Sequence, residues 1–232
     1  MDLSNNRMGK NSMKSFSKEW EEIHRNQEWG KYPSEQLVRF IARNFYNKDR
    51  KNIKILDFGC GAGANTWFLA REGFDVYAFD GSESAVNRAK EYLNKDGYNN
   101  VHFSVMDGTE LDYASDMFDC VVDNVCIYAN KKVHIEIMYK EVYERLKKGG
   151  KLYSACFGEK TDGYGTGKYI EDNTYENIEK GPLEGRAIAH FFTKDELKET
   201  LEVSGFHNII IDEMVYTDNG ISIQMLTAKA DK

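Results

Sequence analysis

Residues 55–70 read ILDFGCGAGANTWFLA, an apolar run that leads into three glycines at alternate positions and then into a helical pattern. Gly59, Gly61 and Gly63 let the chain turn sharply, and they let a ligand approach main-chain N–H groups without a Cβ in the way. The N-terminus of the helix beyond them favours a negative group on that ligand. A tight turn without a ligand would need one glycine rather than three. The stretch therefore predicts a strand, a ligand-binding loop and a helix.

Short apolar runs alternate with helical patterns on both sides of this loop. The run at 118–127 is too uniformly apolar for a half-exposed strand and is typical of a buried parallel strand. Helix signals stand between the runs, including glycines at 149–150 as a stop and T-x-x-E at 193–196 as a capping box. The expected strands cover 53–58, 75–80, 101–107, 118–127, 151–157, 208–216 and 221–230.

The turn at 218–220 is short enough for an antiparallel hairpin, whereas helices join all earlier strands and make those pairs parallel. The pattern predicts an α/β fold with a doubly wound, mostly parallel seven-stranded sheet. It places one reversed strand at the sheet edge.

The chain divides into a short tail and one domain. Residues 1–14 are polar and patternless, so we expect a disordered tail, and 15–232 form the single domain. Within it we expect a helical cap at 15–50. Residues 158–190 exceed the usual connection of ~2 to 6 residues, which favours a loop-rich insertion acting as a lid or substrate segment.

Composition narrows the function classes. The 232 residues carry a formal charge of −7 without a long run of either sign, which argues against nucleic-acid binding. No apolar stretch approaches the ~20 residues that cross a bilayer, and the first residues lack the apolar region of a signal peptide. We expect a cytoplasmic protein without a membrane partner. The four cysteines include no C-x-x-C pair and favour buried thiols.

Carboxylates stand at the ends of two expected strands. Asp57 precedes the glycine loop by two residues, and Asp80 ends the second strand, where it can accept hydrogen bonds from both hydroxyls of a ribose. Asp107 ends the third strand and can accept a hydrogen bond from an adenine amino group. A loop aspartate that caps its own turn is the alternative interpretation of Asp107.

These motifs occur in the order found in a known family. D-x-G-x-G-x-G, Asp80, Asp107, F-D-x-V at 118–121 and L-K-K-G-G before the fifth strand resemble class I (Rossmann-like) S-adenosylmethionine (SAM)-dependent methyltransferases. The N-terminal helices and the insertion at 158–190 are similar to segments that small-molecule members of this family use as a lid. The resemblance spans about 53–157. It implies that the last strand inserts antiparallel between its neighbours.

The resemblance also implies a cofactor site. In such enzymes the glycine loop contacts the methionine moiety, the acid of the second strand contacts the ribose, and the third strand's end contacts the adenine. The end of the fourth strand often meets the cofactor's amino group. The positions that match are Asp57, Gly59, Cys60, Gly61, Gly63, Asp80, Gly81, Asp107, Gly108 and Asn124.

Methyl transfer from a sulfonium is an in-line displacement, so the protein mainly aligns the acceptor and excludes water. Aromatic rings can face the sulfonium charge, which suggests Trp29, Tyr32 and Tyr128. Trp29 and Tyr32 would then cover the cofactor from between two helices. Ordinary helix packing is the alternative for both.

Catalytic candidates come from the end of the insertion. His190 could take a proton from the acceptor, and Arg186 could hold an acidic substrate. A packing role is the alternative for His190, because Ile188, Phe191 and Phe192 flank it. No His and carboxylate cluster resembles a metal site, so we predict no metal.

The sequence thus predicts a SAM-dependent methyltransferase that acts on a small-molecule acceptor and releases S-adenosylhomocysteine (SAH), as a monomer or homodimer. A nicotinamide oxidoreductase would share the sheet but should show G-x-G-x-x-G spacing. The same motifs would also suit a SAM-binding regulatory protein without catalysis, or a methyltransferase that acts on protein side chains.

Overall fold

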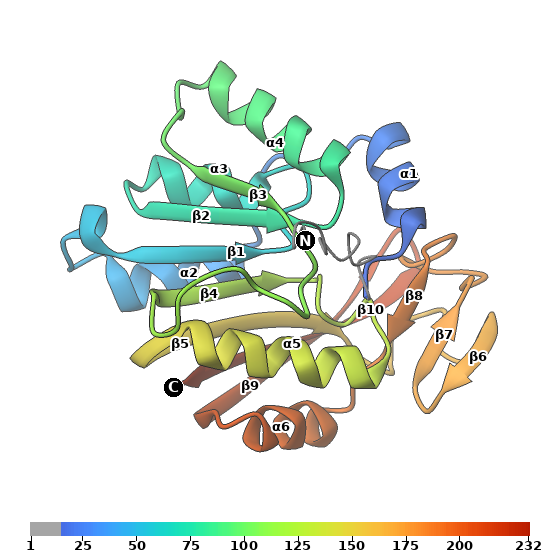
Figure 1. Cartoon of the computed structure of the whole chain (residues 1–232). Helices are drawn as coiled ribbons and strands as arrows, with labels where there is room; N and C mark the ends of the chain where they lie inside the picture. Colours follow the sequence, from blue (N-terminus) through green and yellow to red (C-terminus); the bar gives the residue numbers. More distant parts are fainter. Residues whose placement is uncertain (1–14) are drawn as a thin grey trace, which may run out of the picture.

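Seven strands form the central sheet of the computed structural model, in the order β3-β2-β1-β4-β5-β10-β9 (Figure 1). The structure describes residues 15–232, so the tail predicted at 1–14 lies outside the described residues. The first five strands run parallel, as predicted. The strands are β1 (Lys54–Phe58), β2 (Asp75–Asp80), β3 (His102–Val105), β4 (Phe118–Asn124), β5 (Leu146–Phe157), β9 (His207–Asp218) and β10 (Ile221–Asp231).

The hairpin of β9 and β10 is confirmed, but the reversed strand does not lie at the edge. β10 pairs antiparallel with both β5 and β9, so it is an interior strand, as the family resemblance implies. Asn219 and Gly220 of the turn both have positive φ, 48° and 83°, which suits a two-residue type I′ hairpin. The pattern at 218–220 fixes the reversal, whereas the order of strands depends on contacts distant in sequence.

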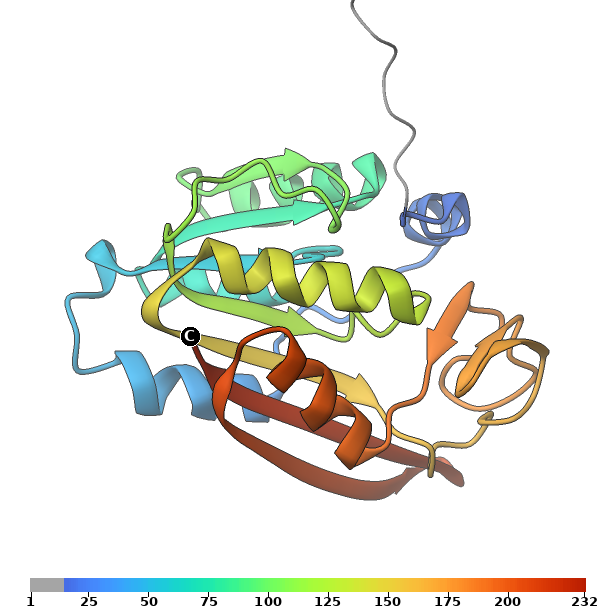
Figure 2. The same ribbon diagram turned by 60° about the horizontal axis from the view of Figure 1, so that its bottom comes forward.

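Helices cover both faces of the sheet. They are α2 (Glu35–Phe45), α3 (Ala64–Arg71) and α4 (Glu83–Lys95) on one face, and α5 (Lys132–Arg145) and α6 (Lys194–Val203) on the other. Figure 2 shows α5 and α6 together on the near face. Thr193 accepts a hydrogen bond from the N–H group of Glu196, so the predicted N-cap of α6 is confirmed, and Ser82 caps α4 in the same way by accepting from Ala85 N–H.

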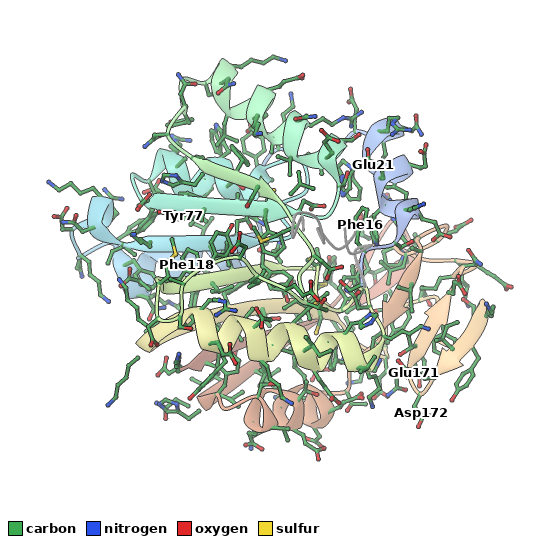
Figure 3. The ribbon with its side chains drawn as sticks, viewed as in Figure 1. Phe16, Glu21, Tyr77, Phe118, Glu171 and Asp172 are labelled. Atoms are coloured by element: carbon green, nitrogen blue, oxygen red, sulfur yellow. The ribbon has the colours of Figure 1, made fainter. Side chains whose placement is uncertain are left out.

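Two apolar cores lie on the two faces. Ile55 of β1 packs against α2 and α3, while its neighbour Leu56 packs on the side of α5, as the alternation of a strand requires. On the α5 side, the rings of Tyr77 and Phe118 meet edge to face at 5.4 Å (Figure 3). Each large side chain that is fully buried contributes about 1.5 to 3 kcal/mol to folding.

The glycines at 149–150 do not stop a helix. Helix α5 ends at Arg145, and β5 begins at Leu146 and includes both glycines. The pairing of β4 with β5 shifts register here, and Gly149 takes a φ of 75°. Lys232 bonds to this irregularity through Gly149 N–H and Gly150 C=O. The prediction was wrong because glycine suits a β-bulge as well as a helix stop.

The insertion predicted at 158–190 contains a small antiparallel sheet. Its strands are β6 (Lys168–Glu171), β7 (Thr174–Glu176) and β8 (Ile188–His190), paired in that order. Helix α1 (Lys18–Asn26) lies near this insertion, above the carboxyl ends of the sheet strands (Figure 1). Of the segment predicted as a cap, α1 therefore covers the strand ends, whereas α2 belongs to the core.

Candidate active site

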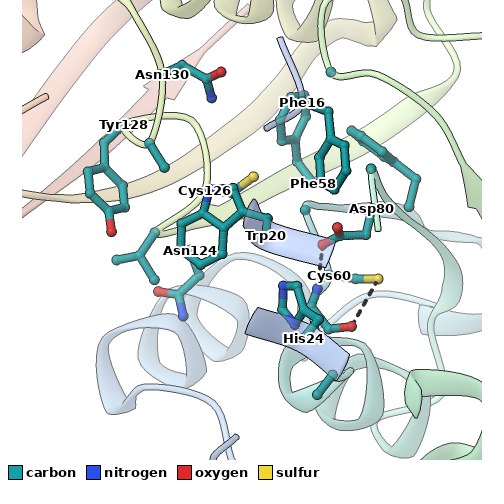
Figure 4. Close-up of a pocket in the computed structure, with 18 of the residues that line it drawn as sticks. Phe16, Trp20, His24, Phe58, Cys60, Asp80, Asn124, Cys126, Tyr128 and Asn130 are labelled. Carbon is teal, nitrogen blue, oxygen red and sulfur yellow. Dashed lines mark hydrogen bonds between the residues drawn. The ribbon is translucent and has the colours of Figure 1, made fainter. Parts of the chain in front are cut away.

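A cavity of about 370 Å³ opens at the carboxyl ends of β1, β2 and β4, where open α/β sheets bind ligands (Figure 4). We call its two ends the glycine end and the aromatic end. The glycine end is formed by the loops after β1, β2 and β3. The aromatic end is formed by the residues Trp29, Tyr128, Phe157 and Arg186.

The glycine loop adopts the backbone that its sequence predicts. Gly59, Gly61 and Gly63 all have positive φ, at 67°, 51° and 92°. A Cβ on Gly59 would lie 2.0 Å from the Sγ atom of Cys126, so this position excludes any side chain. Gly59 and Gly61 line the cavity, whereas Gly63 N-caps α3 and lies against Ala89 of α4. Gly63 therefore serves helix packing.

Asp80 holds the loop after β1 to the loop after β2. Its Oδ2 atom accepts a hydrogen bond from Gly61 N–H at 2.9 Å, and its Oδ1 atom accepts one from Ser82 N–H at 2.8 Å. Burial raises the pKa of this carboxyl group, although the two N–H donors favour its charged form. Each oxygen accepts one of these hydrogen bonds and can accept another, as binding of two hydroxyls requires.

Asp107 is bound by two separate segments. Thr109 donates to Oδ1 from its N–H at 2.9 Å and from its hydroxyl at 2.7 Å, as in a loop that caps its own turn. Ser15 donates to Oδ2 from its N–H at 2.8 Å and to Oδ1 from its hydroxyl at 2.6 Å. Burial alone would raise the pKa of Asp107, but these bonds outweigh it and lower the pKa to about 2.

Two further aspartates lie beneath the cavity rather than in its wall. Asp57 is fully buried and accepts a hydrogen bond from the Thr66 hydroxyl at 2.5 Å, while burial raises its pKa to about 7. Asp123 accepts hydrogen bonds from Cys126 N–H and Ile127 N–H and so shapes the loop after β4. Burial raises the pKa of Asp123 to about 6. No local pattern in the sequence singles out Asp123.

The aromatic end contains one guanidinium among rings. Arg186 lies with its Cζ atom 4.9 Å from the centroid of the Trp29 ring and donates to Gln27 Oε1 at 2.7 Å. The Tyr128 ring meets Phe157 at 5.3 Å, and burial raises the pKa of its phenol. Cation and rings together suit a flat or apolar ligand with a negative group.

His190 lies outside this cavity. It is fully buried, with Nδ1 at 2.8 Å from the Thr174 hydroxyl and Nε2 at 3.3 Å from Glu196 Oε1. Lys132 pairs with the same Glu196 oxygen at 2.6 Å. Burial alone would raise the pKa of Glu196, but the interactions with His190 and Lys132 have the larger effect and lower this pKa to about 2. The cluster joins the insertion to α5 and α6.

His24 of α1 is the histidine that lines the cavity. Its ring centroid lies 6.0 Å from that of Trp20 and 5.1 Å from that of Trp29. Burial lowers the pKa of His24, so it is neutral at pH 7. Its buried Nδ1 atom has no hydrogen-bond partner among the described residues. Trp20 and His24 stand four residues apart on α1 and both line the cavity, which the sequence of this helix alone does not predict.

Most predicted site residues meet in this cavity. Tyr32 borders it, but 75% of this residue is exposed and its ring packs edge-on against Trp67. Asp57, Gly63 and His190 do not line the cavity. Those that do are Trp29, Tyr32, Gly59, Cys60, Gly61, Asp80, Gly81, Asp107, Gly108, Asn124, Tyr128 and Arg186.

Residues 15–232 hold neither a grouped set of metal ligands nor a membrane-spanning helix. In this part of the chain, no three His, Cys, Asp or Glu side chains are grouped as metal ligands would be. No helix within it has the length and apolar character needed to span a membrane.

Comparison with known proteins identifies relatives. The family model described as a methyltransferase domain matches residues 49–205, more than half of the chain. Phosphoethanolamine N-methyltransferase 2 of Caenorhabditis elegans is 29% identical over 156 residues, which cover 60% of this chain and 34% of that protein. The mitochondrial ubiquinone biosynthesis O-methyltransferase of Mus musculus is 24% identical, covering 78% of this chain and 49% of that protein. The chain thus spans between a third and a half of these two relatives.

Solved structures share the fold. A SAM-dependent methyltransferase of Methanosarcina mazei has a TM-score of 0.69 at 24% identity, covering 87% of this chain and 98% of that one. Phosphoethanolamine N-methyltransferase 2 of Haemonchus contortus, in complex with SAM, has a TM-score of 0.66 at 18% identity, covering 92% of this chain and 56% of that one.

Proposed function

The chain belongs to the methyltransferase domain family, and we propose that it transfers the methyl group of SAM to a small-molecule acceptor, releasing SAH. The observation that carries the proposal is a single cavity with two unlike ends. Its glycine end presents a glycine loop with Asp80 and Asp107, and its aromatic end presents rings with Arg186. A nucleoside cofactor and a small acceptor can therefore meet within one cavity.

The glycine end fits the cofactor by its unpaired polar atoms. His24 Nδ1 and Asn65 Oδ1 are buried and lack hydrogen-bond partners among the described residues, and both residues line the cavity. Buried polar groups usually have partners, so these atoms suit a polar ligand such as the amino-acid part of SAM. The ribose would bind Asp80, and the adenine would lie beside Asp107 and Gly108.

Bound SAM supplies a methyl group on a positively charged sulfur, and the chain's own residues orient the acceptor and exclude water. Tyr128 and Trp29 present rings to the cavity, and each ring near a cation is worth about 0.5 to 2 kcal/mol. The N-terminal helix α1 and the insertion enclose the space between them. Alignment of the reacting atoms in a dry site is sufficient for in-line displacement.

The proposed acceptor carries a negative group, because Arg186 is the cation at the aromatic end. For an acceptor that loses a proton, we assign the proton-accepting role to His24 rather than to His190. His24 is neutral and lines the cavity, whereas His190 is fully buried and does not line it. His190 keeps a packing role in this proposal.

Calorimetric titration with SAM, SAH and NADH tests the cofactor assignment. We expect binding of the two sulfur nucleosides and none of NADH. Binding of NADH alone would overturn the proposal in favour of an oxidoreductase.

A screen with methyl-labelled SAM then tests transfer to anionic small molecules. Label transferred to such a molecule supports the proposal. Tight SAM binding without transfer to small molecules or to protein would instead indicate a regulatory SAM-binding protein. Transfer of label to protein alone would mean that the methyl acceptor is a protein side chain.

A further inference from the structure

Two Asp-Gly pairs, Asp80-Gly81 and Asp107-Gly108, lie next to each other at the glycine end, because they lie at the ends of the paired strands β2 and β3. A phenylalanine ring covers each glycine. A Cβ on Gly108 would lie 2.6 Å from Cζ of Phe58, and a Cβ on Gly81 would lie 2.2 Å from Cδ2 of Phe16. The Phe16 ring thus stands where a side chain at position 81 would extend.

Phe16 is held in this place by the acid that faces the expected adenine. Asp107 accepts hydrogen bonds from Ser15 N–H and hydroxyl, and a longer one of 3.4 Å from Phe16 N–H. We call Ser15 and Phe16 the strap. It lies far from Asp107 in sequence and outside the matched family model at 49–205.

The strap leaves room beside it. Ser15 and Phe16 line the same cavity as Met106 and Gly108, so the strap and the loop after β3 face one space. Figure 4 shows Phe16 and Phe58 together at the end of the cavity near Asp80. Two rings at one end of a cavity are groups that can pack on a flat nucleobase.

We propose that Phe16 is a specificity-determining residue that forms one aromatic wall of the nucleobase subsite, in place of the side chain that Gly81 lacks. Asp107 orients the ring through Ser15. This inference rests on the proposed function, since the nucleobase is that of SAM or SAH. It assigns a cofactor contact to a segment that none of the matched motifs includes.

Calorimetric binding of SAH to the full chain tests the wall directly. Phe16→Ala should weaken binding about tenfold, as loss of a ring that stacks on a base does. Gly81→Leu alone should also weaken binding, because its side chain collides with the ring. The double variant Phe16→Ala/Gly81→Leu should bind SAH more tightly than either single variant, because leucine rebuilds the wall from position 81. Gly81 does not have a positive φ, so its backbone accepts leucine.

Ser15→Pro removes both donors of Ser15 and should weaken SAH binding about threefold, by releasing the ring. Lys18→Ala, an exposed change in the first turn of α1, is the matched control and should bind as the parent does. Melting curves of each variant establish that it is folded, and Phe16→Leu replaces Phe16→Ala if the latter does not fold.

The outcomes are distinguishable. If the parent protein binds neither SAM nor SAH, the proposed function fails. If the parent binds SAH and Phe16→Ala binds equally well, the wall does not exist. If Phe16→Ala binds more tightly, the ring competes with the nucleobase, and the inference is overturned. Absence of rescue in the double variant likewise contradicts replacement of a position 81 side chain by Phe16.

Discussion

At the glycine end of the cavity, main-chain N–H groups fix the position of Asp80, whereas at the aromatic end rings and one guanidinium pack on one another. The first end follows directly from three adjacent strands and their loops. The second depends on α1 and the insertion, which meet only in the folded chain. The glycine end therefore tolerates little change in backbone or charge, while the aromatic end can change its ligand without disturbing the sheet.

The largest expected effect comes from the backbone of the glycine end. Gly59→Ala introduces a Cβ at a φ of 67° and 2.0 Å from Cys126 Sγ, so we expect unfolding free energy to fall by about 3 kcal/mol. Denaturant unfolding measures this loss. Gly73→Ala is the matched control, because its φ is 85° but nothing lies near its Cβ, and it should lose about 1 kcal/mol. Equal losses would mean that the contact with Cys126 is unimportant.

The charge of the glycine end gives the next effect. Asp80→Ala should weaken SAM binding roughly 10- to 100-fold, because a hydrogen bond to a charged group is worth about 1.5 to 3 kcal/mol. Calorimetry measures the affinity. Asp75→Ala, at the opposite end of the same strand, should leave it unchanged. Unchanged affinity in Asp80→Ala would remove the ribose role from this residue.

The aromatic end should show a smaller and separable effect. Arg186→Ala should raise the KM for an anionic acceptor about tenfold and leave the Kd for SAM within about twofold. Steady-state kinetics on an acceptor from the labelled screen, with calorimetry for SAM, separates the two. Lys180→Ala removes a positive charge from the same insertion but not from the cavity and serves as control. An equal rise in the KM for the acceptor in both variants would mean that the overall charge of the insertion matters, rather than a contact with Arg186.

The smallest effect concerns the anchor of the insertion. The pKa of Glu196 is lowered from 4.5 to about 2, so its ion pairs stabilise the fold above pH 4.5 and lose that contribution as pH falls toward 2. Melting temperatures between pH 5 and pH 2.5 should fall less steeply in Glu196→Gln than in the parent. Glu202→Gln, in an exposed pair with Lys198, should keep the parent's slope. Identical slopes for the parent and Glu196→Gln would show that the cluster contributes little.

Local chemistry explains what could be predicted from the sequence. The helix cap at Thr193, the glycine loop and the hairpin turn at 218–220 each depend on neighbouring residues, and all were predicted. The prediction for the glycines at 149–150 was wrong because their bulge depends on pairing with Lys232. Strands β6, β7 and β8 of the insertion are too short to show a repeating pattern of apolar residues in the sequence.

The same limit applies to the site. Asp80 and Asp107 could be predicted because Asp80 ends β2 and Asp107 follows β3 by two residues, and parallel strand ends share one edge. His24 and Phe16 reach the cavity through the placement of α1 and its preceding turn, which no local pattern encodes. His190 stands beside apolar neighbours in sequence, and its burial between Thr174 and Glu196 follows that context.

The interior position of β10 fixes the order in which the last two strands join the sheet. β9 pairs only with β10 in the described sheet, so residues 207–218 cannot join the parallel strands until β10 has docked on β5. Ile210 and Val215 of β9 are more than half exposed even in the finished fold, at 59% and 52%. A refolding chain can close the β9–β10 hairpin first and dock it on β5 as a unit, which leaves β9 as an edge strand of the finished sheet. Another chain can pair with an edge strand that exposes apolar side chains, so this edge of the sheet is where the protein is most prone to aggregate.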